Sequence, residues 1–319
     1  MASPHSRSST ADARYAPIRD YAVIGDCHGA ALVSRAGDVD WCCLRRFDAE
    51  PVFSRLLDAD RGGALRLRPD GPFESARRYL TGTNVLETLF ETADGVATVT
   101  DFMPVGRRAF NGTHDYVRLN APGWLVRVVE GRRGMVRMRM AYRPSADFGR
   151  RALSLRADDG VVAAAQGPHL YHDVPGVGVE GDRAAASFEV RAGQRFALVL
   201  APERVARHPA RRAGRLLAVT RAFWEEWIAY CRYDGPYGDQ VRRSALALKL
   251  LTYAPSGAMV AAPTTSLPED LGGSRNWDYR YCWLRDSAFM LYALAALGYG
   301  GEARAFSGFL QRACAASEP

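Results

Sequence analysis

Lysine is almost absent from this chain of 319 residues. Lys249 is the only one, so the formal net charge of +7 comes from arginines that are spread along the whole sequence. Nucleic-acid-binding domains gather their basic residues on one face or helix, often beside aromatic side chains. No such basic run occurs here, so we expect no nucleic-acid partner.

Long hydrophobic runs are missing as well. A membrane-spanning helix needs about 20 consecutive apolar residues, and no run approaches that length. Residues 1–15 are polar and lack the apolar core of a signal peptide. These absences predict a cytoplasmic protein with no membrane partner, and we expect residues 1–15 to form a disordered N-terminus.

Signatures of metal sites are equally scarce. The six cysteines include no C-x-x-C pair and no zinc-ligand spacing. Cys42 and Cys43 are adjacent, so on a strand they would point to opposite faces. We predict buried, reduced thiols, and we expect neither a metal ion nor a cofactor.

Up to about residue 210 the sequence has the pattern of β-strands. Apolar and polar residues alternate in short runs that are separated by turn residues, as in strands with one buried face. Three hairpins are predicted, joining residues 30–34 to 39–44, 84–91 to 96–103, and 124–130 to 135–142. Consecutive hairpins of this kind favour an antiparallel β-sandwich over residues 16–210.

After residue 210 the period changes to that of helices. Apolar residues recur at helical spacing, which predicts helices over 215–231, 240–253, 287–298 and 302–316. A long irregular segment, 254–283, separates the second helix from the third, and loops of this length inside a domain are usually functional. The predicted fold class is α+β and multidomain, with the helical domain over residues 211–319.

One short motif suggests a metal enzyme. "GDCHG" at residues 25–29 matches the G-D-x-H-G signature of metallophosphoesterases, in which the Asp and His hold one of two ions. Such a site also needs a bridging Asp, but Leu57 stands at that position in "LLDADRG", and no G-N-H-D/E block exists. We expect Asp26 and His28 to lie in a loop between strands and keep the metallophosphoesterase as an alternative hypothesis.

The residues best suited to ligand chemistry lie within 264–291. Aromatic rings stack on the flat faces of sugars, and charged groups form directed hydrogen bonds with sugar hydroxyls. Arg285 would donate and Asp286 would accept at neighbouring hydroxyls of one ring. Alternatively, Asp286 caps a helix that begins at Ser287, and the aromatic residues only pack. The segment combines Trp277, Tyr279, Tyr281 and Trp283 with Arg275, Asp278, Arg285 and Asp286.

The stretch "SLPEDLGGSRNWDYRYCWLRDSAFMLYALAALGY" resembles the start of the catalytic domain in glycoside hydrolase family 15, the glucoamylases and bacterial trehalases. "PIRDYAVIGDCHGAALVS" is similar to the N-terminal β-domain of the prokaryotic members. The resemblance implies that Trp283, Arg285 and Asp286 bind the glucose ring at the cleavage subsite, and that Tyr279 lies near the reacting centre. It also implies a β-sandwich followed by an (α/α)6 toroid.

The same resemblance implies an inverting exo-α-glucosidase of the trehalase or glucoamylase type, acting on trehalose or malto-oligosaccharides. Its acid and base are glutamates late in a twelve-helix toroid, which needs roughly 200 residues. Only about 100 residues follow residue 210. We therefore expect an incomplete toroid with no general acid or base, and Glu269 takes neither role. The chain alone would be inactive, and a non-catalytic carbohydrate-binding protein is the alternative.

Overall fold

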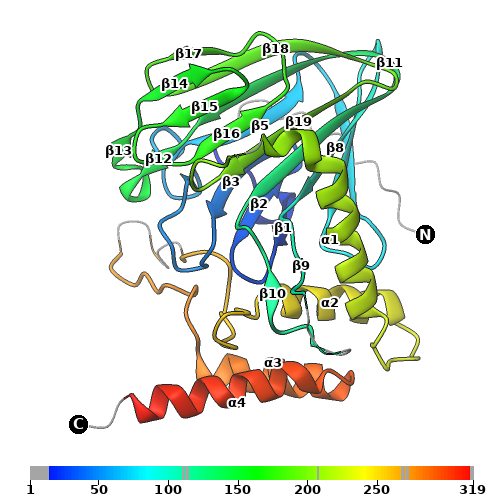
Figure 1. Cartoon of the computed structure of the whole chain (residues 1–319), viewed down its shortest axis with the longest axis vertical. Coiled ribbons are helices and arrows are strands. Elements are labelled where there is room, and N and C mark those ends of the chain that lie inside the picture. The colour runs from blue at the N-terminus through cyan, green and yellow to red at the C-terminus, as the bar shows by residue number, and fades with distance from the viewer. Residues whose placement is uncertain are drawn as a thin grey trace.

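A computed structural model gives the fold of the chain and describes residues 14–109, 112, 115–206, 208–266, 270 and 273–316 (Figure 1). Glu269 lies outside the described residues, as does nearly all of the N-terminal segment that was expected to be disordered. Strands form the first part of the chain and helices form the second part, in the order that the sequence predicts.

The strands are β1 (Tyr21–Gly25), β2 (Ala30–Ser34), β3 (Asp38–Cys43), β4 (Phe53–Ser54), β5 (Ala64–Pro69), β6 (Glu74–Tyr79), β7 (Leu86–Glu91), β8 (Gly95–Phe102), β9 (Gly106–Arg107), β10 (Leu119–Asn120), β11 (Leu125–Arg143), β12 (Ser145–Ala146), β13 (Arg151–Ala152), β14 (Leu155–Asp158), β15 (Val161–Ala164), β16 (His169–His172), β17 (Gly178–Glu180), β18 (Arg183–Arg191) and β19 (Arg195–Ala201). The helices are α1 (Ala213–Ile228), α2 (Gly238–Leu250), α3 (Leu284–Ala296) and α4 (Gly300–Ala315), with 3₁₀ turns η1 (Ile18–Asp20), η2 (Asp147–Gly149) and η3 (Pro209–Arg212).

Two antiparallel sheets form the predicted β-sandwich. One sheet contains β1 to β5, β17 and β18, and the other contains β6 to β8, β14 to β16 and β19. Two predicted hairpins are confirmed, since β2 pairs with β3 and β7 pairs with β8. The fold class inferred from the alternating pattern is therefore correct.

The third predicted hairpin, over residues 124–142, is wrong. Instead of turning at Gly131 to Gly134, the chain continues as β11, a single strand of 19 residues. Its first half pairs with β8 and β19 in one sheet, and its second half pairs with β5 and β18 in the other. The register shifts between Gly131 and Arg133, and such a bulge bends a strand. The glycines therefore let β11 pass from one sheet to the other.

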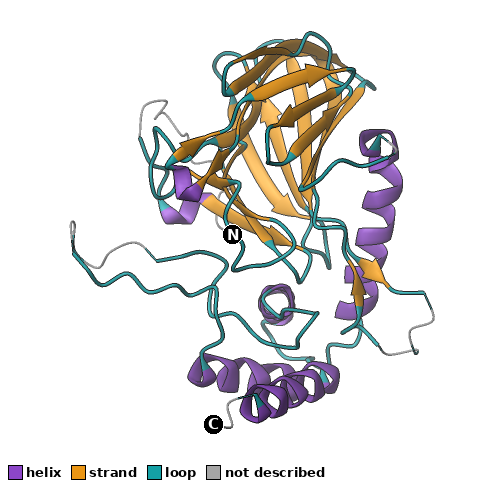
Figure 2. Cartoon of the chain, turned by 60° about the vertical axis from the view of Figure 1, so that its left-hand side comes forward, coloured by secondary structure: helices purple, strands orange, loops and turns teal. Residues whose placement is uncertain are grey.

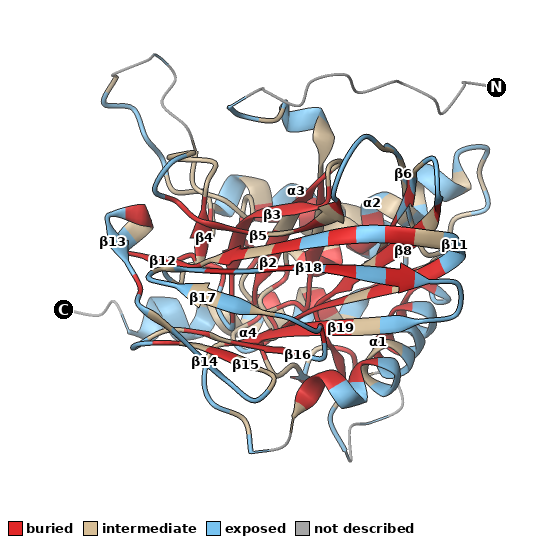
Figure 3. Cartoon of the chain, turned by 90° about the horizontal axis from the view of Figure 1, so that it is seen from above, coloured by how far each residue is buried: buried red, intermediate tan, exposed pale blue. Residues whose placement is uncertain are grey.

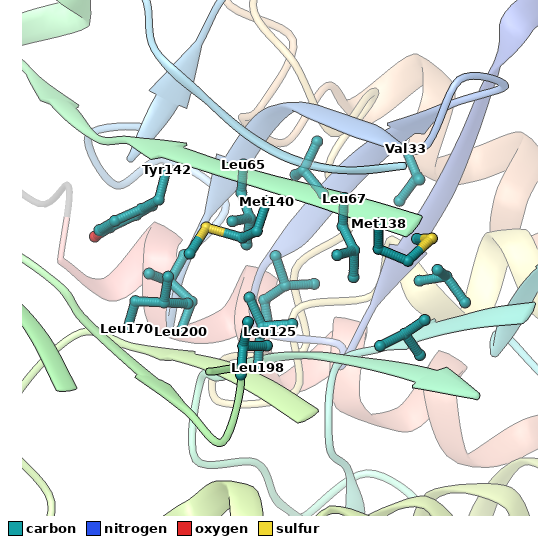
Figure 4. Packing of buried hydrophobic residues seen from close by; sticks show 14 of the residues in the cluster. Val33, Leu65, Leu67, Leu125, Met138, Met140, Tyr142, Leu170, Leu198 and Leu200 are labelled. Atoms are coloured by element: carbon teal, nitrogen blue, oxygen red, sulfur yellow. The ribbon is translucent and has the colours of Figure 1, made fainter. Parts of the chain in front are cut away.

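The core of the β-domain lies between the two sheets. Along β18 every second residue is buried, which is the period that the sequence shows (Figure 3). The bulge in β11 reverses this alternation, so Val129 before it and Val136 after it belong to the same core. Figure 4 shows the facing side chains, among them Val33, Leu65, Leu67, Leu125, Met138, Met140, Tyr142, Leu170, Leu198 and Leu200.

The helical part lies at one end of the β-domain. Figure 2 shows α2 end-on between the strands and the pair formed by α3 and α4. A second core joins these helices to the β-domain and includes Cys27, Phe47, Trp224, Trp227 and Leu250. All four predicted helices are confirmed, and their order is consistent with the first helices of a partial toroid.

Helix α3 begins earlier than the sequence predicts. Leu284 is its first residue, Trp283 is the N-cap residue, and no side chain caps the helix. Asp286 therefore lies in the first turn, and its predicted alternative role as an N-cap before Ser287 is wrong. An acidic residue in the first turn still interacts favourably with the helix dipole.

The outer side of α3 carries large apolar side chains. Leu284, Phe289 and Tyr292 are 67%, 73% and 78% exposed. A soluble helix normally buries such residues, so α3 presents an exposed apolar face. Among the described residues, no helix combines the length and the apolarity that crossing a bilayer requires.

Candidate sugar-binding site

The predicted site segment, which precedes α3 in the chain, folds back on itself. Val260 pairs with Cys282, and Thr265 pairs with Asp278, in isolated antiparallel bridges. Backbone N–H groups of Ala261 and Ala262 extend this pairing to the carbonyls opposite them. The irregular segment between α2 and α3 is thus an ordered antiparallel arm in the residues described.

The four predicted sugar-binding residues lie together where this arm meets the first turn of α3. The rings of Tyr279 and Trp283 stack with their centroids 5.6 Å apart and an interplanar angle of 20°. The guanidinium carbon of Arg285 lies 5.7 Å from the centroid of the Trp283 ring, within the range of a cation–π contact. Arg285 Nη2 donates to Asp286 Oδ2 over 3.1 Å. Stacking surface, donor and acceptor are therefore contiguous.

The other aromatic residues singled out in the sequence are more solvent-exposed. Trp277 and Tyr281 are each 52% exposed, and the backbone N–H of Trp277 donates to Ser266 Oγ over 3.0 Å. Asp278 instead faces inward and accepts hydrogen bonds from Arg280. Partial burial raises the pKa of Asp278, but the bonds from Arg280 outweigh it and hold that pKa below its usual value.

Arg280 was missed by the sequence analysis, although it stands in the middle of the predicted segment. Its side chain is buried and contacts both Asp278 and the loop after β3. No local pattern in the sequence identifies it, because the acceptors of Arg280 outside its own segment are the carbonyls of Phe47 and Ala49 in the β-domain.

The "GDCHG" motif forms a tight turn between β1 and β2, as expected. Asp26 Oδ1 accepts hydrogen bonds from the backbone N–H groups of His28 and Gly29, over 3.0 and 2.8 Å. Burial raises the pKa of Asp26, while His28 and these two bonds oppose the shift. A Cβ atom at Gly29 would collide with the carbonyl oxygen of Cys43. Close packing of the turn thus accounts for the motif.

Within the described ranges, no three His, Cys, Asp or Glu side chains gather in a group that could hold a metal ion. Asp26 and His28 are held by the turn itself and by the neighbouring helical part, since the ring of His28 lies edge-on to Tyr253 at 6.1 Å. The two residues therefore have a structural explanation that needs no metal.

Comparison with protein families assigns both parts of the chain. A family described as "Trehalase-like, N-terminal" matches residues 7–201, and "Glycosyl hydrolases family 15" matches residues 235–318. The chain belongs to the family with the trehalase-like N-terminal domain, and its helical part is similar to glycosyl hydrolase family 15. The first match covers the β-domain, and the second contains the arm residues that form the candidate sugar-binding site.

Relatives in this family are similar along almost the whole chain. Trehalases from Mycolicibacterium smegmatis and Mycobacterium tuberculosis are each 35% identical over 96% of the chain. A trehalase from Thermoplasma volcanium is 32% identical over 92% of it. The matches cover 49%, 48% and 46% of these relatives. The chain thus spans about half the length of the curated relatives that it matches.

Proposed function

We propose that this chain carries the glucose-binding part of an α-glucosidase that cleaves trehalose. The observation that supports this most directly is the contiguous set formed by Tyr279, Trp283, Arg285 and Asp286. The stacked rings offer an apolar platform for one face of a pyranose, and the ion pair offers a donor and an acceptor at its edge. Trehalose is favoured over malto-oligosaccharides because the similar proteins are named trehalases.

Each residue has a distinct role in this proposal. Trp283 stacks on the glucose ring, and Tyr279, stacked on Trp283, holds that indole in place near the reacting centre. Arg285 donates to one hydroxyl and Asp286 accepts from its neighbour, which fixes the ring orientation before any bond is broken. Arg285 and Asp286 keep 70% and 35% of their side chains exposed, so both can reach a ligand.

Glucose binding tests this role. We expect isothermal titration calorimetry to detect glucose binding by the chain, and Arg285→Ala to weaken it by about 10- to 100-fold, the range for a lost charged hydrogen bond. Arg221→Ala is a matched control, because this exposed arginine also pairs with a carboxylate, Glu225, over 3.0 Å. Equal affinities of the two variants would contradict the assignment of Arg285.

We also infer that the 319 residues alone do not hydrolyse their ligand. Inverting hydrolysis needs an acid and a base carboxylate about 6.5–9.5 Å apart across the scissile bond, and the resemblance assigns neither to this sequence. Incubation with trehalose or maltose should therefore release no glucose above a buffer blank, even where calorimetry detects binding. Steady glucose release that Arg285→Ala abolishes would overturn this inference and identify a complete active site.

A further inference from the structure

Arg280 connects the candidate sugar-binding arm to the β-domain. Its side chain is only 3% exposed. Within its own segment it donates two hydrogen bonds to Asp278, from Nε to Oδ1 over 2.9 Å and from Nη2 to Oδ2 over 2.7 Å. The remaining terminal nitrogen, Nη1, donates across the domain boundary to the carbonyls of Ala49 over 2.7 Å and Phe47 over 3.3 Å.

Two aromatic rings of the β-domain lie next to the same guanidinium group. Its carbon lies 5.8 Å from the ring centroid of Trp41 and 5.5 Å from that of Phe148. Phe148 has a φ of +53°, a left-handed conformation that is rare for a bulky residue. Such conformations persist where surrounding contacts hold them and are concentrated at functional sites.

A second contact between the β-domain and the arm involves Trp41. Trp41 Nε1 donates to the carbonyl oxygen of Pro263 over 2.9 Å, so one fully buried tryptophan of β3 contacts both strands of the arm. The β-domain therefore holds the arm at Pro263 and at Arg280. These contacts bridge more than 200 positions of the chain, which makes them specific to the folded arrangement of the two parts.

We propose that Arg280 is a positioning residue, through which the β-domain sets the orientation of the sugar-binding aromatic pair. Arg280 directly follows Tyr279 and precedes Trp283 by three positions, so its anchored side chain restrains the backbone that carries both rings. A planar fork with five donors suits this task, because it fixes direction as well as distance. The inference rests on the proposed function for its ligand, glucose, but its structural part can be tested without sugar.

A general contribution to stability is the competing explanation, and the chain contains a matched control for it. Arg127 is also a buried arginine, with a bidentate aspartate, Asp101, and two carbonyl acceptors. All of its contacts lie within the β-domain, far along the chain from the arm. Arg127→Lys should therefore weaken the fold without altering the arm, whereas Arg280→Ala should release the arm.

Hydrogen–deuterium exchange with peptide resolution measures this difference in the full 319-residue chain. We expect Arg280→Ala to speed exchange in peptides covering 273–283 by about tenfold or more, while peptides of β7 and β8 keep their rates. Arg127→Lys should instead speed exchange in the peptides of β7 and β8 and leave the rates of peptides covering 273–283 unchanged. Arg280→Lys keeps the charge without the fork and should give intermediate exchange, and it replaces the alanine variant if that one does not fold.

Glucose affinity is measured on the same samples, at a temperature where circular dichroism shows each variant to be folded. Arg280→Ala should lower the affinity about tenfold, and Arg127→Lys should leave it within about twofold. Unchanged exchange in 273–283 would overturn the proposal, as would an equal loss of affinity in Arg127→Lys. If the unaltered chain binds no glucose, the proposed function fails by itself, and the exchange data alone decide whether Arg280 positions the arm.

Discussion

Replacing Arg127 with methionine is expected to lower the free energy of unfolding by about 3–5 kcal/mol, because it leaves a buried aspartate without its partner. Neither Arg127 nor Asp101 has any exposed side-chain surface. Arg127 Nε and Nη2 donate to the two oxygens of Asp101, over 2.7 and 3.1 Å. A small domain is stable by roughly 5–15 kcal/mol in total, so the loss is a large fraction of that.

The position of Arg127 explains why the loss is large. Arg127 and Asp101 are directly opposite on β11 and β8 of one sheet. The same guanidinium group donates to the carbonyl of Leu65, on β5 of the other sheet, over 2.9 Å, and to that of Gly37 over 2.8 Å. Breaking the pair therefore removes a polar connection between the two sheets and leaves buried acceptors unsatisfied.

Urea denaturation followed by tryptophan fluorescence measures this effect. The double variant Arg127→Met with Asp101→Leu removes both charges and should recover more than half of the lost stability. Arg221→Met, at an exposed ion pair on α1, should cost no more than about 1 kcal/mol. A loss of under about 1 kcal/mol for Arg127→Met would show that the buried pair contributes little.

Local patterns in the sequence predicted most of the elements. The alternation of Ala31, Val33 and their neighbours identifies β2, and the helical spacing around Trp224 and Trp227 identifies α1, because burial of one face imposes a period on each segment. The four residues of the candidate sugar-binding site could also be predicted together, since they lie within eight positions of the chain. In each case the information is contained in one short segment.

The errors occur where distant segments decide the structure. "GRRG" at 131–134 has the composition of a turn, and Gly134 does adopt a positive φ of 60°. The residues that follow nevertheless pair with β5 and β18, so the chain continues as one strand and does not turn back on the residues before it. Similarly, Arg280 finds its acceptors 231 and 233 positions away, and no short-range pattern contains that pairing.

Lys249 is another residue whose role depends on distant partners. It lies on α2, within a predicted helix, but its side chain is only 1% exposed. Nζ donates to Glu302 Oε1 on α4 and to the carbonyl of Tyr116, each over 2.8 Å. Trp227 Nε1 on α1 donates to the same Glu302 oxygen over 3.0 Å. One buried ion pair thus connects three of the four helices.

Removal of Glu302 is expected to open this helical part. Glu302→Ala leaves the ammonium of Lys249 buried without a counter-ion, at a cost of about 3–5 kcal/mol. Lys249 is the only lysine, and peptide mass spectrometry separates its acetylation by an amine-reactive ester from that of the α-amino group, so labelling of its peptide reports the opening of this site. Where opening is fast relative to labelling, the labelling rate follows the free energy of opening, and each 1.4 kcal/mol by which that free energy falls raises the rate about tenfold. Glu302→Ala should therefore raise the labelling rate of Lys249 by roughly a hundredfold or more.

Two further variants make this result specific. Glu302→Gln keeps an oxygen acceptor for Lys249 and Trp227 but loses the charge, so its labelling rate should lie between those of the unaltered chain and Glu302→Ala. Glu225→Ala removes a half-exposed partner of Arg221 on α1 and should change the rate by less than about fivefold. Labelling of Glu302→Ala at the original rate would mean that the helices are held by their apolar core alone, without help from the buried pair.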